Sequence, residues 1–239
     1  MRYSKRMGQV FLQSRRIASY EVDLLGEPGT VLEIGPGHGV LTKILVERGF
    51  NVTAVEKDRY IYGELQALKA NNLNLINMDF LDMAPGSYDY IIGNIPYSIS
   101  SPIIFKLYEF NFRRSVIMVQ KEFAEKIALP DDMSRLYVNA YVRYRIELKR
   151  YVSKRNFNPQ PEVDSAILVL EKKKYEEPYP MDFLDGVLIE MFSKKRKKLS
   201  NIFDVYPPGM GDKRPSNLTV SEILDLVRLL YESGFSAHR

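Results

Sequence analysis

The hydrophobic pattern alternates between two kinds of segment along most of the chain. Short apolar runs rich in β-branched residues occur at residues 30–34, 52–56, 73–77, 88–93, 115–120, 146–152 and 165–170. Between several of these runs, apolar residues recur with the spacing of one helical face, as at residues 40–45 and 61–68. Buried strands that alternate with amphipathic helices are typical of an α/β fold. We therefore predict a doubly wound sheet with a late, hairpin-like return of the last strand.

The pattern changes at about residue 174. Three consecutive lysines precede Pro178 and Pro180, a composition that indicates a linker. Beyond it the chain shows only helical signals: one helix opens at Asp182, and residues 219–222 have the sequence of a capping box. We therefore predict a domain of residues 1–174, which begins with a basic N-terminal arm, and a small all-helical domain of residues 175–239.

Glycines and acids occur where the predicted strands end. The sequence Gly-Pro-Gly-His-Gly at residues 35–39 joins the first strand to a helix, and glycines there let a ligand approach the backbone. Glu56 ends the second strand, a position that suits a pair of ribose hydroxyls. Asp79 and Phe80 follow the third strand and offer an acid and a ring to an adenine. The alternatives are a tight turn without a ligand and carboxylates that serve as caps or surface charges, and we interpret His38 as an exposed turn residue.

The stretch from Asn94 to Tyr97 follows the fourth strand and offers three groups to a planar amine. Asn94 has a carboxamide oxygen, Ile95 has a backbone carbonyl whose direction Pro96 restricts, and Tyr97 has an aromatic face. A nucleobase amino group needs two acceptors and a ring on which to stack. An ordinary turn is the alternative, because Asn and Pro are turn formers. We predict that Ser101 is the N-cap of the helix that follows.

Composition limits the possible functions. The chain has 239 residues, 45% of them hydrophobic, no cysteine and two histidines, so we expect a real core, no disulfide and no metal site. No apolar run approaches the roughly 20 residues of a membrane span, and no signal peptide is evident, so we expect a cytoplasmic protein. The net charge of +4 permits a nucleic acid partner. The five consecutive cations at residues 194–198 favour phosphate binding over a merely solvated helix face.

Six motifs in this order resemble those of the KsgA/Erm ribosomal RNA adenine N6-dimethyltransferases, most closely the archaeal small-subunit branch. They are Gly-Gln-Val-Phe-Leu at 8–12, the glycine motif with its flanks at 33–42, Val-Glu-Lys-Asp at 55–58, Asp79, Asn-Ile-Pro-Tyr at 94–97, and the segment 157–166. Residues 134–136 and 196–201 also fit. The chain departs from the family at Val10, where bacterial members usually have Asn, and at Gln13, where the family often has Asp.

The resemblance implies a Rossmann-like class I methyltransferase sheet, S-adenosylmethionine as the cofactor, no metal, and RNA binding by the helical domain. The cofactor-binding residues that it implies are Gln9, Val10, Leu12, Glu33, Gly35, Gly37, Glu56, Asp79, Phe80 and Asn94. The catalytic residues that it implies are Asn94, Ile95, Pro96, Tyr97 and Phe157.

The activity implied is N6,N6-dimethylation of adjacent adenosines near the 3′ end of small-subunit rRNA during ribosome biogenesis. The substrate is the rRNA in the small subunit or its precursor, and the enzyme is expected to be a monomer. The alternatives are an Erm-like large-subunit methyltransferase and a non-catalytic ribosome-assembly factor on the same fold. The intact residues 94–97 argue against a purely binding role, and residues 163–165 and 196–201 favour the small-subunit substrate.

Overall fold

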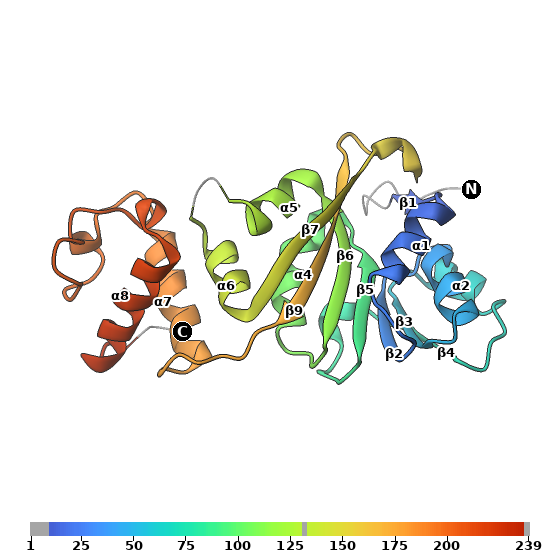
Figure 1. Cartoon of the computed structure of the whole chain (residues 1–239), viewed down its shortest axis with the longest axis horizontal. Helices are drawn as coiled ribbons and strands as arrows, with labels where there is room; N and C mark the ends of the chain where they lie inside the picture. The colour runs from blue at the N-terminus through green and yellow to red at the C-terminus, as the bar shows by residue number, and fades with distance from the viewer. Residues whose placement is uncertain (1–9, 131–132, 237–239) are drawn as a thin grey trace. The chain divides into compact units, whose positions relative to one another are not determined.

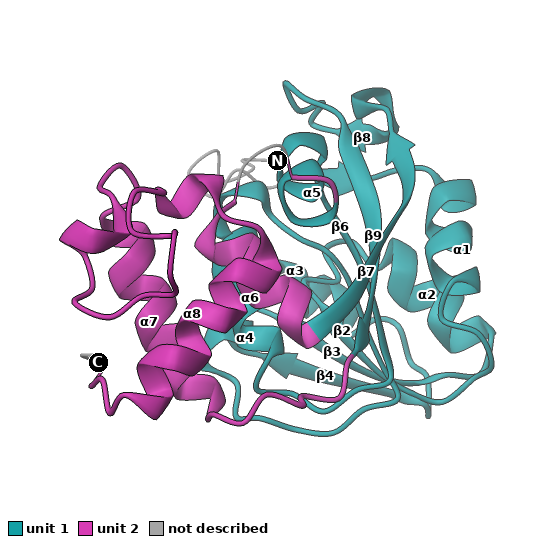
Figure 2. Cartoon of the chain, turned by 60° about the vertical axis from the view of Figure 1, so that its left-hand side comes forward, with its two compact units in different colours: residues 1–128, 144–172 teal, residues 129–143, 173–239 magenta. Residues whose placement is uncertain are grey.

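The computed structural model describes residues 10–130 and 133–236, which form two compact units (Figure 2). The first unit comprises residues 1–128 and 144–172, and the second comprises residues 129–143 and 173–239. The second unit therefore includes helix α6 (Arg135–Arg143), which lies before the predicted boundary at residue 174.

The first unit is built on a seven-stranded sheet with the order β4-β3-β2-β5-β6-β9-β7 (Figure 1). Its strands are β2 (Thr30–Ile34), β3 (Asn51–Glu56), β4 (Leu73–Asn77), β5 (Tyr90–Asn94), β6 (Arg114–Gln120), β7 (Tyr144–Val152) and β9 (Ser165–Lys172). The five strands from β4 to β6 pair in parallel, and β9 lies antiparallel between β6 and β7. The predicted α/β class and the late antiparallel return are confirmed.

Helices cover both faces of this sheet because its central parallel strands β2, β5 and β6 are buried on both sides. They are α1 (Arg15–Asp23), α2 (Val40–Glu47), α3 (Arg59–Leu65), α4 (Ser100–Leu107) and α5 (Lys121–Ala128). Figure 1 shows α1 and α2 side by side on one face and α4 on the other. A continuous core joins α1 and α2 to the strands, with Ile17, Leu45 and Ile92 among its fully buried members.

Short 3-10 turns form part of the loops that follow two of the strands. Asp79 caps the turn η2 (Phe80–Asp82), and η3 (Tyr97–Ile99) runs directly into α4. Because α4 begins at Ser100, the prediction that Ser101 is the N-cap is wrong, and Ser101 lies inside the first turn. The Ser100 hydroxyl instead donates to the carbonyl of Tyr97 at 3.3 Å.

The second unit is helical, with α6, α7 (Met181–Ser193), α8 (Val220–Glu232) and the 3-10 turns η5 (Leu199–Asn201) and η6 (Pro215–Asn217). The predicted capping box is present at the start of α8. Arg143 of α6, whose side chain is nearly buried, makes two hydrogen bonds of 2.9 and 2.8 Å to Asp185 of α7. No helix within the described residues has the length and apolar character needed to cross a bilayer.

Candidate active site

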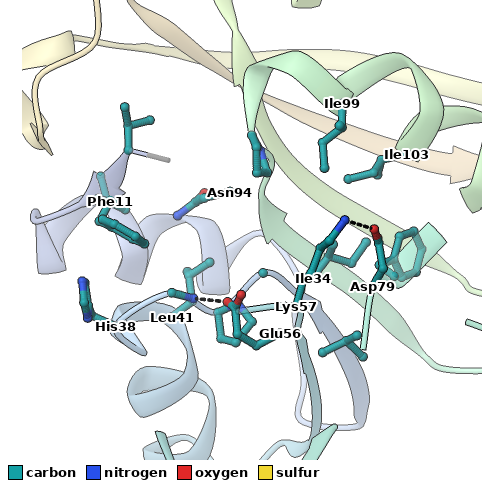
Figure 3. Close-up of a pocket in the computed structure, with 18 of the residues that line it drawn as sticks. Phe11, Ile34, His38, Leu41, Glu56, Lys57, Asp79, Asn94, Ile99 and Ile103 are labelled. Carbon is teal, nitrogen blue, oxygen red and sulfur yellow. Dashed lines mark hydrogen bonds and ion pairs between the residues drawn. The ribbon is translucent and has the colours of Figure 1, made fainter. Parts of the chain in front are cut away.

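A cavity of about 360 Å³ lies at the carboxyl ends of the parallel strands (Figure 3). Strand β2 pairs with β3 on one side and β5 on the other, so the loops after these strands diverge from a topological switch point. Open α/β sheets bind ligands at this place because the diverging loops leave a crevice. The predicted residues that line the cavity are Val10, Leu12, Gly35, Gly37, Glu56, Asp79, Phe80, Asn94 and Pro96.

The glycine turn after β2 forms one wall. Gly37 has a φ of 53°, and a Cβ placed there would lie 2.8 Å from the ring of Phe11. Its N–H donates to Glu56 Oε2 at 3.3 Å. Glycine at this position therefore lets the turn pack closely under Phe11 and direct an amide at the end of the neighbouring strand.

Glu56 ends β3 with its carboxyl group inside the cavity, and the residue is 4% exposed. Burial raises the pKa of this carboxyl, and the N–H groups of Asp58 and Gly37 partly offset the effect. Asp58 N–H donates to Oε1 at 2.9 Å, so each carboxyl oxygen accepts one backbone hydrogen bond. Carboxylate oxygens have further lone pairs, which leaves acceptor capacity for a ligand hydroxyl.

Asp79 and Lys57 form an ion pair at the end of the cavity beside β4, drawn as a dashed line in Figure 3. Lys57 Nζ lies 2.6 Å from Asp79 Oδ2, and Leu81 N–H donates to Oδ1 at 3.0 Å. Burial alone would raise the pKa of Asp79, but the hydrogen bonds from Lys57 and Leu81 outweigh burial and lower it. The sequence did not single out Lys57 as part of the site.

The stretch that begins at Asn94 lies across the cavity from Asp79 (Figure 3). Asn94 Oδ1 is buried and has no hydrogen-bond partner among the described residues. Ile95 is buried, Pro96 lines the cavity, and Tyr97 is half-buried with its hydroxyl 2.7 Å from Ser165 Oγ. Burial raises the pKa of Tyr97, so the neutral phenol can serve as a rigid aromatic surface. Asn94 thus has a buried hydrogen-bond acceptor that lacks a donor, and the ring of Tyr97 is held in place by a hydrogen bond. This combination suits a ligand amine.

A two-stranded ribbon closes another side of the cavity. Strand β1 (Phe11–Leu12) pairs antiparallel with β8 (Phe157–Asn158), and Leu12 is opposite Phe157. The rings of Phe11 and His38 lie 4.5 Å apart between centroids, and both residues line the cavity. The ribbon thus joins the cavity wall to the segment that contains Phe157. The predicted residue Gln9 lies outside the described residues.

Four predicted residues do not line the cavity: Glu33, Ile95, Tyr97 and Phe157. The other lining residues were not predicted, and they include Phe11, His38, Lys57, Met78, Ile99 and Ile103. Most of these residues lie within a few positions of a predicted strand end. The sequence therefore indicates them as a group but does not show which of them line the cavity. In the part of the chain that the structure describes, no three His, Asp or Glu side chains are grouped to hold a metal ion.

The sequence is similar to a known protein family over most of its length. The model of the ribosomal RNA adenine dimethylase family matches residues 2–232, almost the whole chain. The chain belongs to this family. The resemblance found in the sequence motifs is therefore confirmed.

Individual dimethylase relatives cover most of the chain. A ribosomal RNA small subunit methyltransferase A from Malacoplasma penetrans is 40% identical over 86% of this chain and 79% of its own length. A probable enzyme of the same name from Thermococcus kodakarensis is 38% identical over 82% of this chain and 72% of its own length.

Among solved structures, a dimethyladenosine transferase from Plasmodium falciparum has a TM-score of 0.82 and 28% identity, and the match covers 95% of this chain and 100% of that one. The 23S rRNA methyltransferase ErmE has a TM-score of 0.73 and 26% identity, with coverage of 92% and 99%. The fold of this dimethylase family member is thus the methyltransferase fold that the sequence predicted.

Glu33 lies in β2, directly before the cavity residue Ile34, and is completely buried. Burial raises the pKa of its carboxyl from the usual 4.5 to about 8, and the nearby Glu56 contributes in the same direction. The folded protein therefore binds this proton more tightly than the unfolded chain does. The stability that the bound proton contributes to the folded state is fully present below pH 4.5 and is lost as the pH rises through about 8.

We predict that the free energy of unfolding of the cofactor-free protein falls as the pH rises from about 5 to about 8. Glu33→Gln removes the titrating group and should flatten this dependence, by up to about 1.4 kcal/mol per pH unit. Urea unfolding at a series of pH values measures both slopes. Identical slopes for the wild type and Glu33→Gln would contradict the assignment.

Proposed function

We propose that this dimethylase uses S-adenosylmethionine to methylate N6 of adjacent adenosines twice near the 3′ end of small-subunit rRNA. The observation that carries the proposal is that Asn94 ends β5 at the cavity with a buried acceptor oxygen, three residues before Tyr97, whose ring is anchored through its hydroxyl. The small-subunit substrate is favoured over the large-subunit one by the names of the relatives that cover most of the chain.

The cavity has groups of the right kind to hold the proposed cofactor. Glu56 has carboxylate lone pairs for two ribose hydroxyls, and Asp79 with Phe80 offers an acid and an aromatic residue for the adenine. Gly35 and Gly37 bring backbone close to the ligand space. When bound, S-adenosylmethionine supplies an electrophilic methyl group, so the protein needs no nucleophilic side chain.

The protein's task is to activate the acceptor nitrogen. The lone pair of adenine N6 is delocalised into the ring, which makes the amine a poor nucleophile. If Asn94 Oδ1 and the Ile95 carbonyl accept hydrogen bonds from its two N–H groups, the nitrogen becomes more tetrahedral and its lone pair can point toward the methyl group. Tyr97, together with Phe157, would hold the extruded base by stacking.

The same geometry permits the second transfer. The first methylation leaves a positively charged nitrogen, which releases one proton to solvent, and N6 then keeps one N–H and a lone pair. Either acceptor of the Asn94–Ile95 pair can hold the remaining proton, while the other no longer has a donor. Dimethylation therefore needs a fresh cofactor but no different set of residues.

The direct test is incubation of the protein with labelled cofactor and, separately, small-subunit particles, large-subunit particles and naked rRNA, followed by mapping of the modified base. We expect dimethyladenosine in the small-subunit rRNA. Label confined to large-subunit rRNA would support the Erm-like alternative, and absence of label from every substrate would support a non-catalytic assembly factor.

Asn94→Ala is expected to lower methyl transfer by about 10²-fold or more, because one preorganised acceptor is removed where charge develops. Binding of S-adenosylmethionine should remain largely intact, since Glu56 and Asp79 are unchanged. Single-turnover transfer and calorimetric binding measure the two effects separately. Turnover near that of the wild type would exclude the proposed role of Asn94.

Glu56→Ala should weaken S-adenosylmethionine binding by about 1.5–3 kcal/mol, because the ribose loses a charged acceptor. Glu56→Gln is the matched control, since it keeps an acceptor oxygen at the same place and should lose less affinity. Calorimetry on both variants tests the assignment. Unchanged affinity in Glu56→Ala would mean that other residues hold the ribose.

The basic turn, residues 194–198, is the best candidate for binding RNA phosphates in the second unit. Helix α7 ends at Ser193, so these cations form a turn rather than a helix face. Lys194 pairs with Glu190, and Lys198 Nζ lies 2.7 Å from Asp212 Oδ1. Lys195, Arg196 and Lys197 are exposed and make no ion pair within the described residues. Their charges are therefore available to phosphates.

Replacing Lys195, Arg196 and Lys197 by Gln should weaken RNA binding and leave thermal stability and cofactor affinity nearly unchanged. The slope of log affinity against log salt should become shallower by about 0.7–0.9 for each phosphate that the protein no longer neutralises. The double variant Lys194→Gln/Lys198→Gln is the matched control, because those two charges already have acidic partners and should change the slope less. Equal slopes in the triple variant and the wild type would show that the basic turn does not bind RNA.

A further inference from the structure

Tyr97 is attached to the sheet through its hydroxyl group. The residue begins the turn η3, and its hydroxyl forms a 2.7 Å hydrogen bond with Oγ of Ser165, the first residue of β9. Ser165 is fully buried and lies 68 positions further along the chain. Stacking on a base needs only the face of the ring. The function proposed for Tyr97 therefore does not by itself account for the hydroxyl or for its partner.

Ser165 is the fixed member of this pair. Strand β9 lies between two other strands, and Ser165 is paired with Gln120 of β6 on one side and with Val152 of β7 on the other. Tyr97, in contrast, belongs to a turn of only three residues, and the cap of this turn is Pro96, whose side chain has no hydrogen-bonding group. The hydrogen bond therefore positions the ring of Tyr97 relative to the sheet.

The two methyl transfers make different demands on this ring. In the first transfer, Asn94 Oδ1 and the Ile95 carbonyl can each accept a hydrogen bond from one of the two N6 N–H groups. In the second, N6 forms a bond to the methyl carbon of a fresh cofactor as the carbon–sulfur bond breaks, and the last N6 proton passes to solvent. Before that step the monomethylated amine has a single N–H group and can engage only one acceptor. Stacking must then supply more of the orientation of the base.

We propose that Ser165 is a positioning residue for the second methylation: by holding the Tyr97 hydroxyl, it fixes the ring on which the monomethylated base stacks. This role rests on the proposed function, because it requires Tyr97 to contact the target adenosine. Ser165 is buried and does not line the cavity, so it acts on the reaction only through Tyr97. A ring without this hydrogen bond still stacks, but it moves with its turn, and the lone pair of the base then points at the methyl group less often.

Ser165→Ala removes the partner of the hydroxyl and leaves Tyr97 intact. With small-subunit particles and S-adenosylmethionine, we expect the first transfer to slow by no more than about twofold. The ratio of N6-monomethyladenosine to N6,N6-dimethyladenosine should rise by about fivefold or more, which is the effect of one neutral hydrogen bond. Mass spectrometry of nucleosides from the digested rRNA measures both products at matched extents of methylation. A loss of folded enzyme would slow both transfers equally and leave this ratio unchanged, so the ratio separates positioning from a merely structural role.

Two further variants make the test specific to this hydrogen bond. Tyr97→Phe keeps the ring and removes the hydroxyl, so it should raise the product ratio as Ser165→Ala does, and the double variant should raise it no further. Ser115→Ala is the matched control, because Ser115 is a fully buried serine of the neighbouring strand β6 whose Oγ has no partner among the described residues. It should leave the product ratio at the wild-type value. If Ser165→Ala does not fold, Tyr97→Phe is tested in the same assays.

A second readout does not depend on turnover. Ser165→Ala and Tyr97→Phe remove the same hydrogen bond from opposite ends, so their effects on the free energy of unfolding should not be additive in the double variant. Urea unfolding of the cofactor-free protein measures all three variants beside the wild type.

The outcomes separate this role from the proposed function. A wild-type protein that methylates no adenosine in any substrate would overturn the proposed function and the role of Ser165 with it. Dimethylation by the wild type, with an unchanged product ratio in Ser165→Ala and Tyr97→Phe, would overturn the positioning role alone, as would additive effects on unfolding. A raised ratio in both variants, no further rise in the double variant and a normal ratio in Ser115→Ala would together support the proposal.

Discussion

The parallel pairing of β2 with both β3 and β5 is the constraint on which the rest of the site depends. This register aligns Val31 with Val52 on one side and Tyr90 on the other, so the three strands end at the same edge of the sheet. The glycine turn, Glu56 and Asn94 then surround one cavity although they are far apart in the chain. A slip of one residue would turn each side chain to the opposite face of the sheet and separate them.

Much of this arrangement was predictable because its signals are local. Strand composition and the residues at strand ends identified Glu56, Asp79 and Asn94, and the structure places all three at the cavity. Other features depend on contacts between distant segments. Strand β1 has two residues, too few for any periodic pattern, and it exists because it pairs with β8.

Three glutamates are buried in the first unit of a protein with a net charge of +4, and one of them, Glu56, lines the cavity. Burial raises the pKa values of Glu21, Glu33 and Glu56. Ionisation of these groups therefore lowers the free energy of unfolding. A fold selected for stability alone would place apolar residues at such positions. Violations of local packing preference are expected where a site needs polar groups, and the large apolar core of α1, α2 and the sheet compensates for them.

The ribbon of β1 and β8 has a thermodynamic consequence. Phe11 forms part of the cavity wall, while Leu12 of the same strand is paired with Phe157, the residue proposed to stack on the target base. If filling the cavity and stacking on the base favour the same conformation of this ribbon, each ligand raises the affinity for the other by the same factor, because coupling between two binding equilibria is reciprocal. The two backbone pairings of the ribbon would then couple the binding of cofactor and RNA, so that each increases the affinity of the enzyme for the other.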